Sequence, residues 1–313
     1  MTEIPDSAAT FRILSLDGGG AKGFYTLGVL REIEAMAGKR LCDVFPLIFG
    51  TSTGSIIATL LALGYSVDTI HSLYRDNVPT IMKARTKGGK TKALRDLAGS
   101  VFGDQKFDAL KTGIGIVATN WETERPMIFK ADPAQAHGRQ ASFEPGFGCT
   151  LADAVEASCS AYPFFEKKRL TNPKGDKLLL IDGGYCANNP TLYAIADGLK
   201  VKGQARSALR VVSVGVGQYP QPSRSALGWA LGQLVSVQLL QKTLEVNTAS
   251  MEQLRQILFG DVATVRISDT FERPDLATDM FEHDLDKLSL LRRSGAESFA
   301  KREAELRSLL ELN

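Results

Sequence analysis

A serine between two glycines is the first residue of this chain whose setting could do chemistry. Residues 50–54, GTSTG, match the pattern G-x-S-x-G, with Gly50 and Gly54 on either side of Ser52. They follow the apolar run PLIFG and open the apolar stretch SIIATLLALG, so a strand turns into a helix there. Such a turn exposes a serine, and the helix start favours negative charge nearby. We therefore predict that Ser52 is a nucleophile.

A serine hydroxyl needs a base, and an aspartate supplies one candidate. In LLLIDGGYCANNP, residues 178–190, Asp182 ends an apolar strand and precedes Gly183 and Gly184. Open α/β sheets place functional groups at the carboxyl ends of their strands. The same letters are also typical of an ordinary Asp-Gly turn, so both interpretations remain open on this segment alone.

Histidine is the more usual base, and the chain has three. His71 lies in the apparent surface helix TIHSLYRD, and His137 lies in the polar loop AQAHGRQ. His283, in MFEHDLDK, fits the order Ser, Asp, His along the chain that α/β-hydrolases use. A Ser-Asp-His esterase that uses His283 is therefore the alternative.

A glycine-rich segment, LSLDGGGAKG at residues 14–23, follows a strand-like run and precedes a helix-like one. Gly18, Gly19 and Gly20 allow backbone N–H groups to approach a ligand closely, because no Cβ intervenes. The helix dipole adds positive potential at that point. The segment therefore predicts a site for a negative oxygen, which could be a phosphate or a transient oxyanion.

The same glycines also spell G-x-G-x-x-G, the fingerprint of dinucleotide-binding domains. That fold places an acidic residue at the end of its second strand, where this chain has Gly50, Thr51 and Ser52. A phosphate-binding P-loop requires G-K-S or G-K-T, which the segment lacks. These two interpretations are disfavoured.

A basic segment, KARTKGGKTKALR at residues 83–95, contains no acidic residue. Its charges are Lys83, Arg85, Lys87, Lys90, Lys92 and Arg95. It is either a solvated flexible loop or a contact for an anion, such as a lipid headgroup or a nucleotide. The net charge of the whole chain is only +2, so we expect no DNA or RNA partner.

Length and composition are those of a globular protein: 313 residues, 44% hydrophobic and 23% charged. The four cysteines form no CxxC pair and show no metal-binding spacing, so we expect reduced core cysteines and no metal. The polar start, MTEIPDSAAT, does not resemble a signal peptide. No apolar run reaches the roughly 18 residues of a membrane span, so a cytoplasmic protein is expected.

Strand-like runs alternate with helical stretches through the first two thirds of the chain. The runs are 11–16, 46–50, 114–120, 126–131, 177–184 and 210–217. This alternation predicts a mostly parallel sheet covered on both faces. We expect a mobile tail over residues 1–10, a catalytic core over 11–217, and a helical part over 218–313 packed on the same domain. In that last part Leu227, Leu231, Leu234, Leu239, Leu240 and Leu244 are expected to face the core.

Taken together, the three glycine clusters resemble those of the patatin-like phospholipases. That family has D-G-G-G-x-[RK]-G, G-x-S-x-G and D-G-[GA] in this order, matched here from Asp17 to Gly23, at 50–54 and from Asp182 to Gly184. The segments ASCSAYPFF at 157–165 and NNP at 188–190 are similar as well. The resemblance covers residues 11 to about 217. Lys22 stands where many members have arginine, so a bidentate guanidinium is replaced by a point charge.

The resemblance implies a three-layer α/β/α fold and a Ser52–Asp182 dyad. It also implies an oxyanion hole made by Gly18, Gly19, Gly20 and Lys22. The activity implied is hydrolysis of fatty acyl esters of membrane phospholipids or neutral lipids, without a metal or other catalytic cofactor.

One bacterial group of the family is similar in its opening, RILSLDGGGAKGFYTLGVLREIE. Its members are effectors of anti-phage signalling by cyclic oligonucleotides. This implies a cyclic oligonucleotide activator, a homo-oligomer in the active state, and action at the inner membrane surface. The alternatives are an unregulated intracellular lipase or esterase, and a non-enzymatic binding module that would leave Ser52 and Asp182 without a role.

Overall fold

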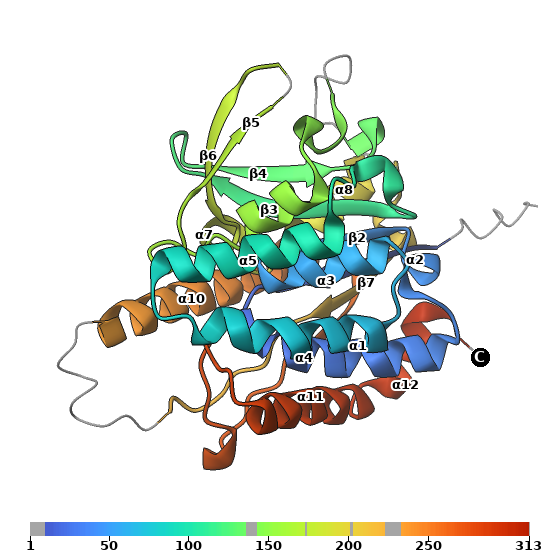
Figure 1. Cartoon of the computed structure of the whole chain (residues 1–313). Helices are drawn as coiled ribbons and strands as arrows, with labels where there is room; N and C mark the ends of the chain where they lie inside the picture. The colour runs from blue at the N-terminus through green and yellow to red at the C-terminus, as the bar shows by residue number, and fades with distance from the viewer. Residues whose placement is uncertain (1–9, 136–142, 173, 201–202, 223–232, 313) are drawn as a thin grey trace, which may run out of the picture.

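An eight-stranded mixed sheet forms the centre of the computed structural model, which describes residues 10–135, 143–172, 174–200, 203–222 and 233–312 (Figure 1). Within these residues the strand order is β5-β6-β3-β2-β1-β7-β8, and β4 pairs with β3. The strands are β1 (Phe11–Leu16), β2 (Leu47–Thr51), β3 (Gly113–Asn120), β4 (Arg125–Lys130), β5 (Lys168–Thr171), β6 (Lys177–Asp182), β7 (Leu209–Val214) and β8 (Ala263–Ile267).

The part of the sheet that carries the glycine-rich segment and the serine turn is parallel, because helices connect its strands. Strand β2 is buried at every position, which its apolar sequence predicts for a strand covered on both faces. In the register of β1 and β2, Leu16 lies opposite Gly50. The glycine-rich segment and the Ser52 turn therefore leave the sheet side by side.

Strand β3 is longer than β2 and pairs with three strands. Strand β4 runs antiparallel along one edge of β3, over residues 115–120. The other edge is shared: β2 pairs with residues 113–117, and β6 pairs antiparallel with residues 118–120. Strands β2 and β6 therefore meet end to end, with Thr51 opposite Val117 and Asp182 opposite Ala118.

This pairing corrects the expectation that Asp182 lies at the carboxyl end of a parallel strand. Asp182 does end a strand, but β6 runs antiparallel to β3 and therefore opposite to β2. The rule for the carboxyl ends of parallel strands does not apply to it. Asp182 reaches Ser52 because β6 continues the edge of β3 where β2 stops.

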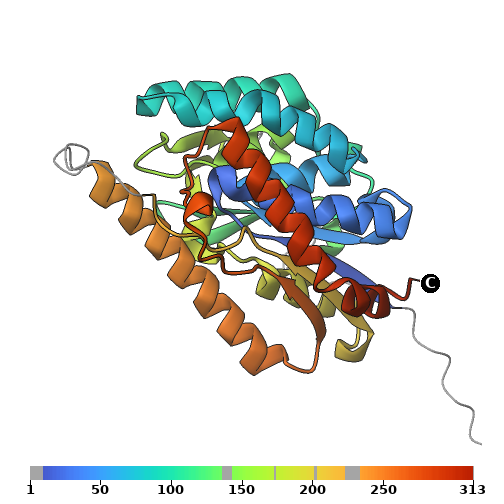
Figure 2. The same ribbon diagram turned by 90° about the horizontal axis from the view of Figure 1, so that it is seen from below.

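Helices cover both faces of the sheet, and Figure 2 shows α10 on the opposite side of the molecule from α4 and α5. The helices are α1 (Gly23–Ala37), α2 (Leu41–Val44), α3 (Thr53–Ala62), α4 (Val67–Lys83), α5 (Lys87–Phe102), α6 (Leu151–Ser158), α7 (Gly184–Ala187), α8 (Thr191–Lys200), α10 (Gln233–Phe259), α11 (Leu285–Ala300) and α12 (Glu303–Leu310). The predicted α/β fold with a mostly parallel sheet is confirmed.

The basic segment 83–95 is not a flexible loop. It ends α4 and forms the first half of α5, and the Thr86 hydroxyl accepts a hydrogen bond from the Gly89 N–H at 3.0 Å. This cap satisfies one of the free donors at the start of the helix. The composition of the segment resembles a loop because of its two glycines, whereas the cap and the apolar residues that follow favour a helix.

The C-terminal part contributes a strand as well as helices, since β8 pairs with β7. In α10, Leu240 and Leu244 are buried as expected. Leu239 is 65% exposed, so that expectation is wrong, because residue 239 points about 100° away from residue 240 on a helix. Leu227, Leu231 and nearly all of the predicted tail lie outside the described residues, as does the side chain of Leu234. In the described part of the chain, no helix is long and apolar enough to span a membrane.

Candidate active site

Ser52 occupies a strained turn between β2 and α3. Its φ of 53° and ψ of −125° are unusual for a residue with a side chain. The Ser52 carbonyl accepts hydrogen bonds from the Ser55 N–H at 2.8 Å and the Ser55 hydroxyl at 2.7 Å. A Cβ on Gly54 would lie 2.4 Å from the Leu16 carbonyl oxygen, so only glycine fits there. The turn has the geometry of a nucleophile elbow.

The last residue of α6, Ser158, and the segment that follows it hold both strand ends. The Ser52 N–H donates to the Ser158 hydroxyl at 2.9 Å, which in turn donates to the Val117 carbonyl at 2.5 Å. The Asp182 N–H donates to the Ser160 carbonyl at 3.0 Å, and the Gly183 N–H donates to the Ser158 carbonyl at 3.2 Å. Fully buried Ser158 therefore ties the serine turn to the aspartate turn. Sequence reasoning did not single out Ser158, whose only signal is that it is the first of the two serines in ASCSAYPFF.

The Asp182 carboxylate is buried beside Ser52. It accepts a hydrogen bond from the Gly184 N–H at 2.7 Å. Burial raises the pKa of Asp182 to about 6, while hydrogen bonds from the Gly184 N–H and the Ser52 hydroxyl act in the opposite direction. A carboxylate in this setting is mostly ionised at neutral pH and is a stronger base than an exposed one.

The alternative base does not reach this pair. His283 is exposed just before α11, where its Nδ1 lies 3.3 Å from the Phe281 carbonyl oxygen. The hydrogen bonds that act on Asp182 come from Gly184 and Ser52, not from a histidine. His71 packs its ring against Phe24, and His137 lies outside the described residues. The Ser-Asp-His arrangement with His283 is therefore wrong for this structure.

The glycine-rich segment turns beside Ser52. A Cβ on Gly18 would lie 3.1 Å from the Ser52 Cβ. The Gly18 N–H donates to the Asn188 carbonyl at 3.0 Å, so the expectation that Gly18 offers a free donor is wrong. The N–H groups of Gly19 and Gly20 have no acceptor among the residues that the structure describes. These two remain as candidate donors to a negative oxygen.

The charged residues of that segment are both buried and paired. Asp17 forms a two-pronged ion pair with Arg266 of β8, one bond of which, from Nη1 to Oδ1, is 2.8 Å. Burial raises the pKa of Asp17, and Arg266 acts against this. Burial lowers the pKa of Lys22, whose ammonium lies 3.6 Å from a Glu245 carboxylate oxygen on α10. Arg266 and Glu245 belong to the part of the chain that no motif covers, so sequence reasoning did not find them.

Helix α10 covers the site through Asn188. The Asn188 N–H donates to Asn247 Oδ1, and its side-chain amide donates to Thr248 Oγ1, both at 2.8 Å. The same amide donates to the Gly18 carbonyl at 3.2 Å. Leu244 packs so closely that a Cβ on Gly184 would lie 2.7 Å from its methyl group. The resemblance included Asn188 in NNP, but no sequence pattern indicates its partners on α10.

The remaining motif glycines serve close packing. A Cβ would lie 2.7 Å from Thr53 Oγ1 at Gly23, 2.3 Å from the Gly54 carbonyl at Gly50 and 2.1 Å from the Val117 carbonyl at Gly183. Of the four cysteines, Cys42, Cys149 and Cys159 are buried and Cys186 is half-buried, and all four are free. Cys159 lies against the site, where burial first, and the nearby Asp182 charge, raise the pKa of its thiol.

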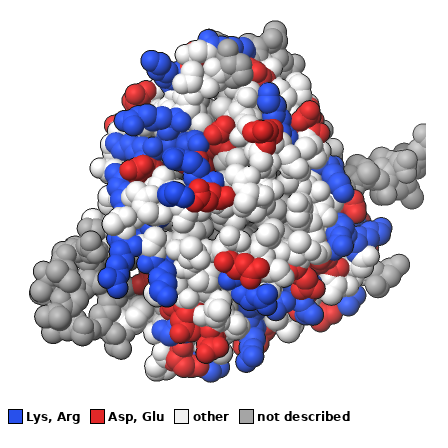
Figure 3. All heavy atoms as spheres, in the orientation of Figure 1, with Lys and Arg blue, Asp and Glu red and all other residues white. Residues whose placement is uncertain are grey.

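The basic residues of 83–95 do not act as one group. Lys90 is buried and donates to the Met82 carbonyl at 2.6 Å, so the expectation that it contacts an anion is wrong. Lys92 pairs with Asp96, and Arg95 pairs with the buried Glu156. The other three, Lys83, Arg85 and Lys87, are exposed. Figure 3 shows lysine and arginine gathered on the side where α4 passes into α5.

Comparison with known families bears on these motifs. The family model described as "Patatin-like phospholipase" matches residues 14–195, which contain the serine turn, the glycine-rich segment and the aspartate turn. This chain belongs to the patatin-like phospholipase family. It is therefore a hydrolase.

Among curated relatives, a "cUMP-AMP-activated phospholipase" of Escherichia coli is 60% identical, covering 96% of this chain and 93% of its own. A "cGAMP-activated phospholipase" of Pseudomonas aeruginosa is 27% identical over 69% of this chain, and "Patatin-like protein 3" of Arabidopsis thaliana is 30% identical over 63%. This chain spans 64% and 54% of the length of the last two relatives.

Proposed function

We propose that the protein is a lipid acyl hydrolase in which Ser52 and Asp182 act as a dyad. Asp182 takes the Ser52 proton as Oγ attacks the ester carbonyl, and the N–H groups of Gly19 and Gly20 stabilise the oxyanion. Asp182 then gives the proton to the leaving alcohol, which leaves an acyl-enzyme. It next accepts a proton from water, which hydrolyses the acyl-serine and restores both residues.

The meeting of β2 and β6 carries this proposal. Two features support it: Ser52 lies in a strained turn at the end of β2, and burial raises the pKa of the Asp182 carboxylate at the adjoining end of β6 to about 6. A base with that pKa is ionised at pH 7 and accepts a proton more readily than an ordinary aspartate. Burying the Asp182 carboxylate costs free energy, which is expected of a group retained for chemistry.

The substrate and activator follow from the relatives. We take the substrate to be membrane phospholipid, since relatives named as phospholipases match most of the chain. The activator we propose is a cyclic dinucleotide of the cUMP-AMP type, because the 60% identical relative is named for that response. In this proposal the protein is a cytoplasmic anti-phage effector that forms a homo-oligomer when activated and acts at the inner membrane surface.

The exposed basic residues offer a contact for an anion in this scheme. These residues are Lys83, Arg85 and Lys87, around the junction of α4 and α5. On α5, the Thr91 hydroxyl accepts a hydrogen bond from the Glu166 N–H at 2.8 Å. Phosphate contacts from such side chains are charge-assisted. We keep these three residues, without Lys90, as the predicted contact for nucleotide or lipid headgroup.

The test is release of fatty acid from phosphatidylglycerol vesicles, with and without cUMP-AMP, by wild-type protein and by Ser52→Ala. We expect hydrolysis that rises at least tenfold with nucleotide and is absent from Ser52→Ala at unchanged melting temperature. Activity retained by Ser52→Ala would refute the dyad. Full activity without nucleotide would leave an unregulated lipase, and a protein that hydrolyses no ester under either condition would be a binding module.

A further inference from the structure

Asn188 holds Gly18, the first glycine of the glycine-rich segment, by hydrogen bonds in both directions. The Gly18 N–H donates to the Asn188 carbonyl at 3.0 Å, and the Asn188 side-chain amide donates to the Gly18 carbonyl at 3.2 Å. Asn188 lies 170 positions further along the chain, and both residues are buried. The peptide groups on either side of Gly18 are therefore fixed by one distant residue, in a setting where water does not compete.

The bond to the Gly18 carbonyl also sets the direction of the Gly19 N–H. The peptide between Gly18 and Gly19 is trans, since the one cis peptide of the described residues joins Tyr162 to Pro163. In a planar trans peptide, the C=O of one residue and the N–H of the next point in opposite directions. A donor that binds the carbonyl on one side therefore aims the N–H to the other side.

We propose that Asn188 is a positioning residue, whose side-chain amide aims the Gly19 N–H at the oxyanion that forms when Ser52 attacks an ester. The proposal rests on the function proposed above, which assigns that N–H to the oxyanion, and it adds the residue that orients the donor. A Cβ on Gly18 would lie 3.1 Å from the Ser52 Cβ. The peptide that Asn188 holds therefore lies beside the nucleophile.

The second candidate donor, the Gly20 N–H, is held in a different way. The Gly19 carbonyl accepts a hydrogen bond from the Lys22 N–H at 3.2 Å, in the short turn that leads into α1. By the same peptide geometry, this local bond fixes the direction of the Gly20 N–H. Of the two donors, the Gly19 N–H is the one that depends on a distant side chain. A change at Asn188 should therefore misdirect one donor and leave the other in place.

The neighbours of Asn188 determine which way its amide faces. The Thr248 hydroxyl donates to the Leu244 carbonyl at 3.0 Å, so it accepts from Asn188, and the Gly18 carbonyl accepts as well. The NH2 group must face both. Asn188 Oδ1 has no hydrogen-bond partner among the described residues, which costs free energy that a leucine of the same shape would avoid. The asparagine is therefore explained by the two bonds that its NH2 group donates.

Asn188→Leu tests the proposal, because leucine has the branched shape of asparagine without its donors. Both backbone bonds of residue 188, to Gly18 and Asn247, remain. Complete loss of one oxyanion donor costs about 10²–10³ in kcat, so a misdirected one should cost about 10- to 100-fold, with KM within about threefold of wild type. The substrate is p-nitrophenyl octanoate, at saturating cUMP-AMP.

A transition-state analogue separates this role from a structural one. Ser52 Oγ adds to the carbonyl carbon of decyl trifluoromethyl ketone and gives its proton to Asp182, so the carbonyl oxygen becomes an oxyanion at the donors. In Asn188→Leu the Ki of this ketone should rise by the factor by which kcat falls. The pKa of the hemiketal, followed by fluorine NMR, should rise by about one to two units. The Ki of decyl methyl ketone, which stays a neutral ketone, should not change.

A second variant, Thr248→Val, keeps the test valid if Asn188→Leu does not fold. It removes one of the two acceptors that hold the Asn188 amide, so kcat should fall about two- to tenfold, and Thr248→Ser should restore it. Thr243→Val is the matched control on the same helix. The Thr243 hydroxyl also donates to the carbonyl four residues earlier, at 2.8 Å, but Thr243 is exposed. This control should stay within about twofold of wild type.

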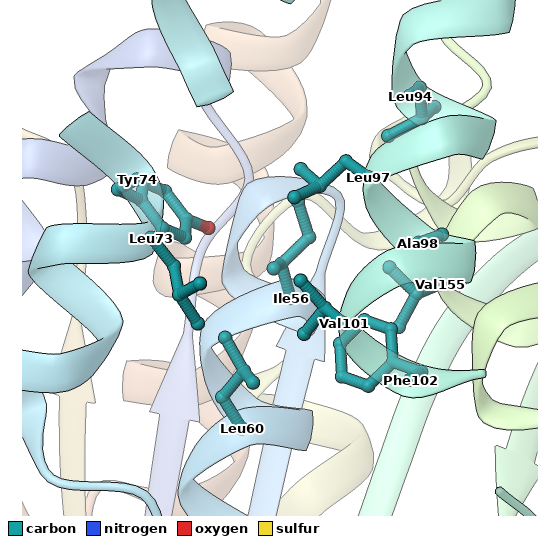
Figure 4. Close-up of a pocket in the computed structure, with 10 residues that line it drawn as sticks. All are labelled: Ile56, Leu60, Leu73, Tyr74, Leu94, Leu97, Ala98, Val101, Phe102 and Val155. Atoms are coloured by element: carbon teal, nitrogen blue, oxygen red, sulfur yellow. The ribbon is translucent and has the colours of Figure 1, made fainter. Parts of the chain in front are cut away.

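A further control lowers stability without touching the glycine-rich segment. Leu97 on α5 lies in the packed apolar interior between α3, α4, α5 and α6 (Figure 4). Leu97→Ala should lower the melting temperature, as truncation of a buried side chain does, while the ratio of the two ketone Ki values stays as in wild type. A weaker response to the trifluoromethyl ketone alone is therefore not a consequence of lower stability.

The outcomes separate this inference from the function on which it rests. A fall in kcat with a matching rise in the Ki of the trifluoromethyl ketone alone supports it. Unchanged kcat in folded Asn188→Leu overturns it. A fall in kcat with a rise in the Ki of both ketones, or of neither, also overturns it, since Asn188 would then hold the fold or the substrate. If the wild type forms no hemiketal, the proposed function fails and this inference fails with it.

Discussion

The two sides of the site are built in different ways. On the sheet side, backbone hydrogen bonds to buried strands and to Ser158 hold Ser52 and Asp182. On the other side, α10 is joined by side-chain contacts, such as the Asn188 amide with Thr248 and the Lys22 ammonium with Glu245. The two proposed catalytic residues thus lie at rigid strand ends, while the packing of α10 depends on side-chain contacts that a ligand could exchange.

The same contrast appears in what each side exposes. The strands around Ser52 are buried, whereas α10 presents large apolar side chains to solvent. These are Leu239, Val246, Leu254, Ile257 and Leu258. A helix with one face on the site and an apolar outer face is stabilised by less packing than the core elements are. Three changes, from the largest expected effect to the smallest, test this difference.

Replacing Asp182 by asparagine should have the largest effect. Loss of the base should lower kcat by about 10²- to 10⁴-fold in the vesicle assay. The free energy of unfolding should increase, although the activity falls. With a folded pKa of about 6 against 3.8 in the unfolded chain, the wild type loses stability as pH rises from about 4 to 6. Asparagine avoids this loss of about 3 kcal/mol, so Asp182→Asn should resist urea better at pH 7.5 and equally at pH 4.

The matched control for that measurement is Asp153→Asn. Burial acts to raise the pKa of Asp153, but hydrogen bonds from Lys168 and Thr150 hold it below its usual value. Its carboxylate therefore stabilises the fold at neutral pH, and Asp153→Asn should be the less stable protein at pH 7.5. If Asp182→Asn were also less stable to urea than the wild type at pH 7.5, the Asp182 carboxylate would stabilise the fold. The prediction that its burial costs stability at this pH would then be wrong.

An intermediate effect is expected from Gly19→Ala in the glycine-rich segment. The new methyl group would lie 2.6 Å from a Val216 methyl carbon, so the segment must shift and tilt its free N–H groups. We expect kcat to fall at least about tenfold with little change in KM. Gly99→Ala, on an open stretch of α5, is the control and should keep full activity. Equal rates for the two variants would mean that Gly19 only shapes the turn.

The smallest effect should come from a substitution in α10, the helix that packs over the site. Glu245→Gln removes the carboxylate that faces Lys22, so amides of α10 near residue 245 should exchange with deuterium about three- to tenfold faster. Exchange in β1 and β2 should not change, since these strands open only with the whole domain. Lys242→Gln, an exposed position on the same helix, is the control. Acceleration in β1 as well would show that α10 and the core unfold as one unit.

Much of the fold could be predicted because its signals are local. The apolar run of β2, the glycines around Ser52 and the helix-forming stretch after it lie within about fifteen residues of one another. Strand β5 was not predicted, because Lys168–Thr171 is short, charged and partly exposed at the sheet edge. A flexible loop was one of the two interpretations of residues 83–95, because the run of basic residues is typical of solvated segments, whereas the structure shows α5 capped by Thr86.

The partners of the site residues could not be predicted in the same way. Arg266 lies 249 positions from Asp17, and Glu245 lies more than 220 positions from Lys22. No spacing rule connects residues at such distances, because only the folded sheet and the packing of α10 bring them together. The charge of Lys90 is read from the sequence, but its burial depends on how α4 meets α5.

The sequence by itself determined the chemical groups and the turns that carry them. Glycines at fixed positions allow the tight turns, and the serine and aspartate beside them bring the reactive groups, so Ser52 and the glycine-rich segment could be named in advance. The tertiary structure decided that Asp182 lies beside Ser52. Pairing in a sheet is set by register between distant strands, and here β6 runs against β3 and ends where β2 ends. It also decided that Asp182 is buried, and burial is what raises its pKa toward that of a useful base.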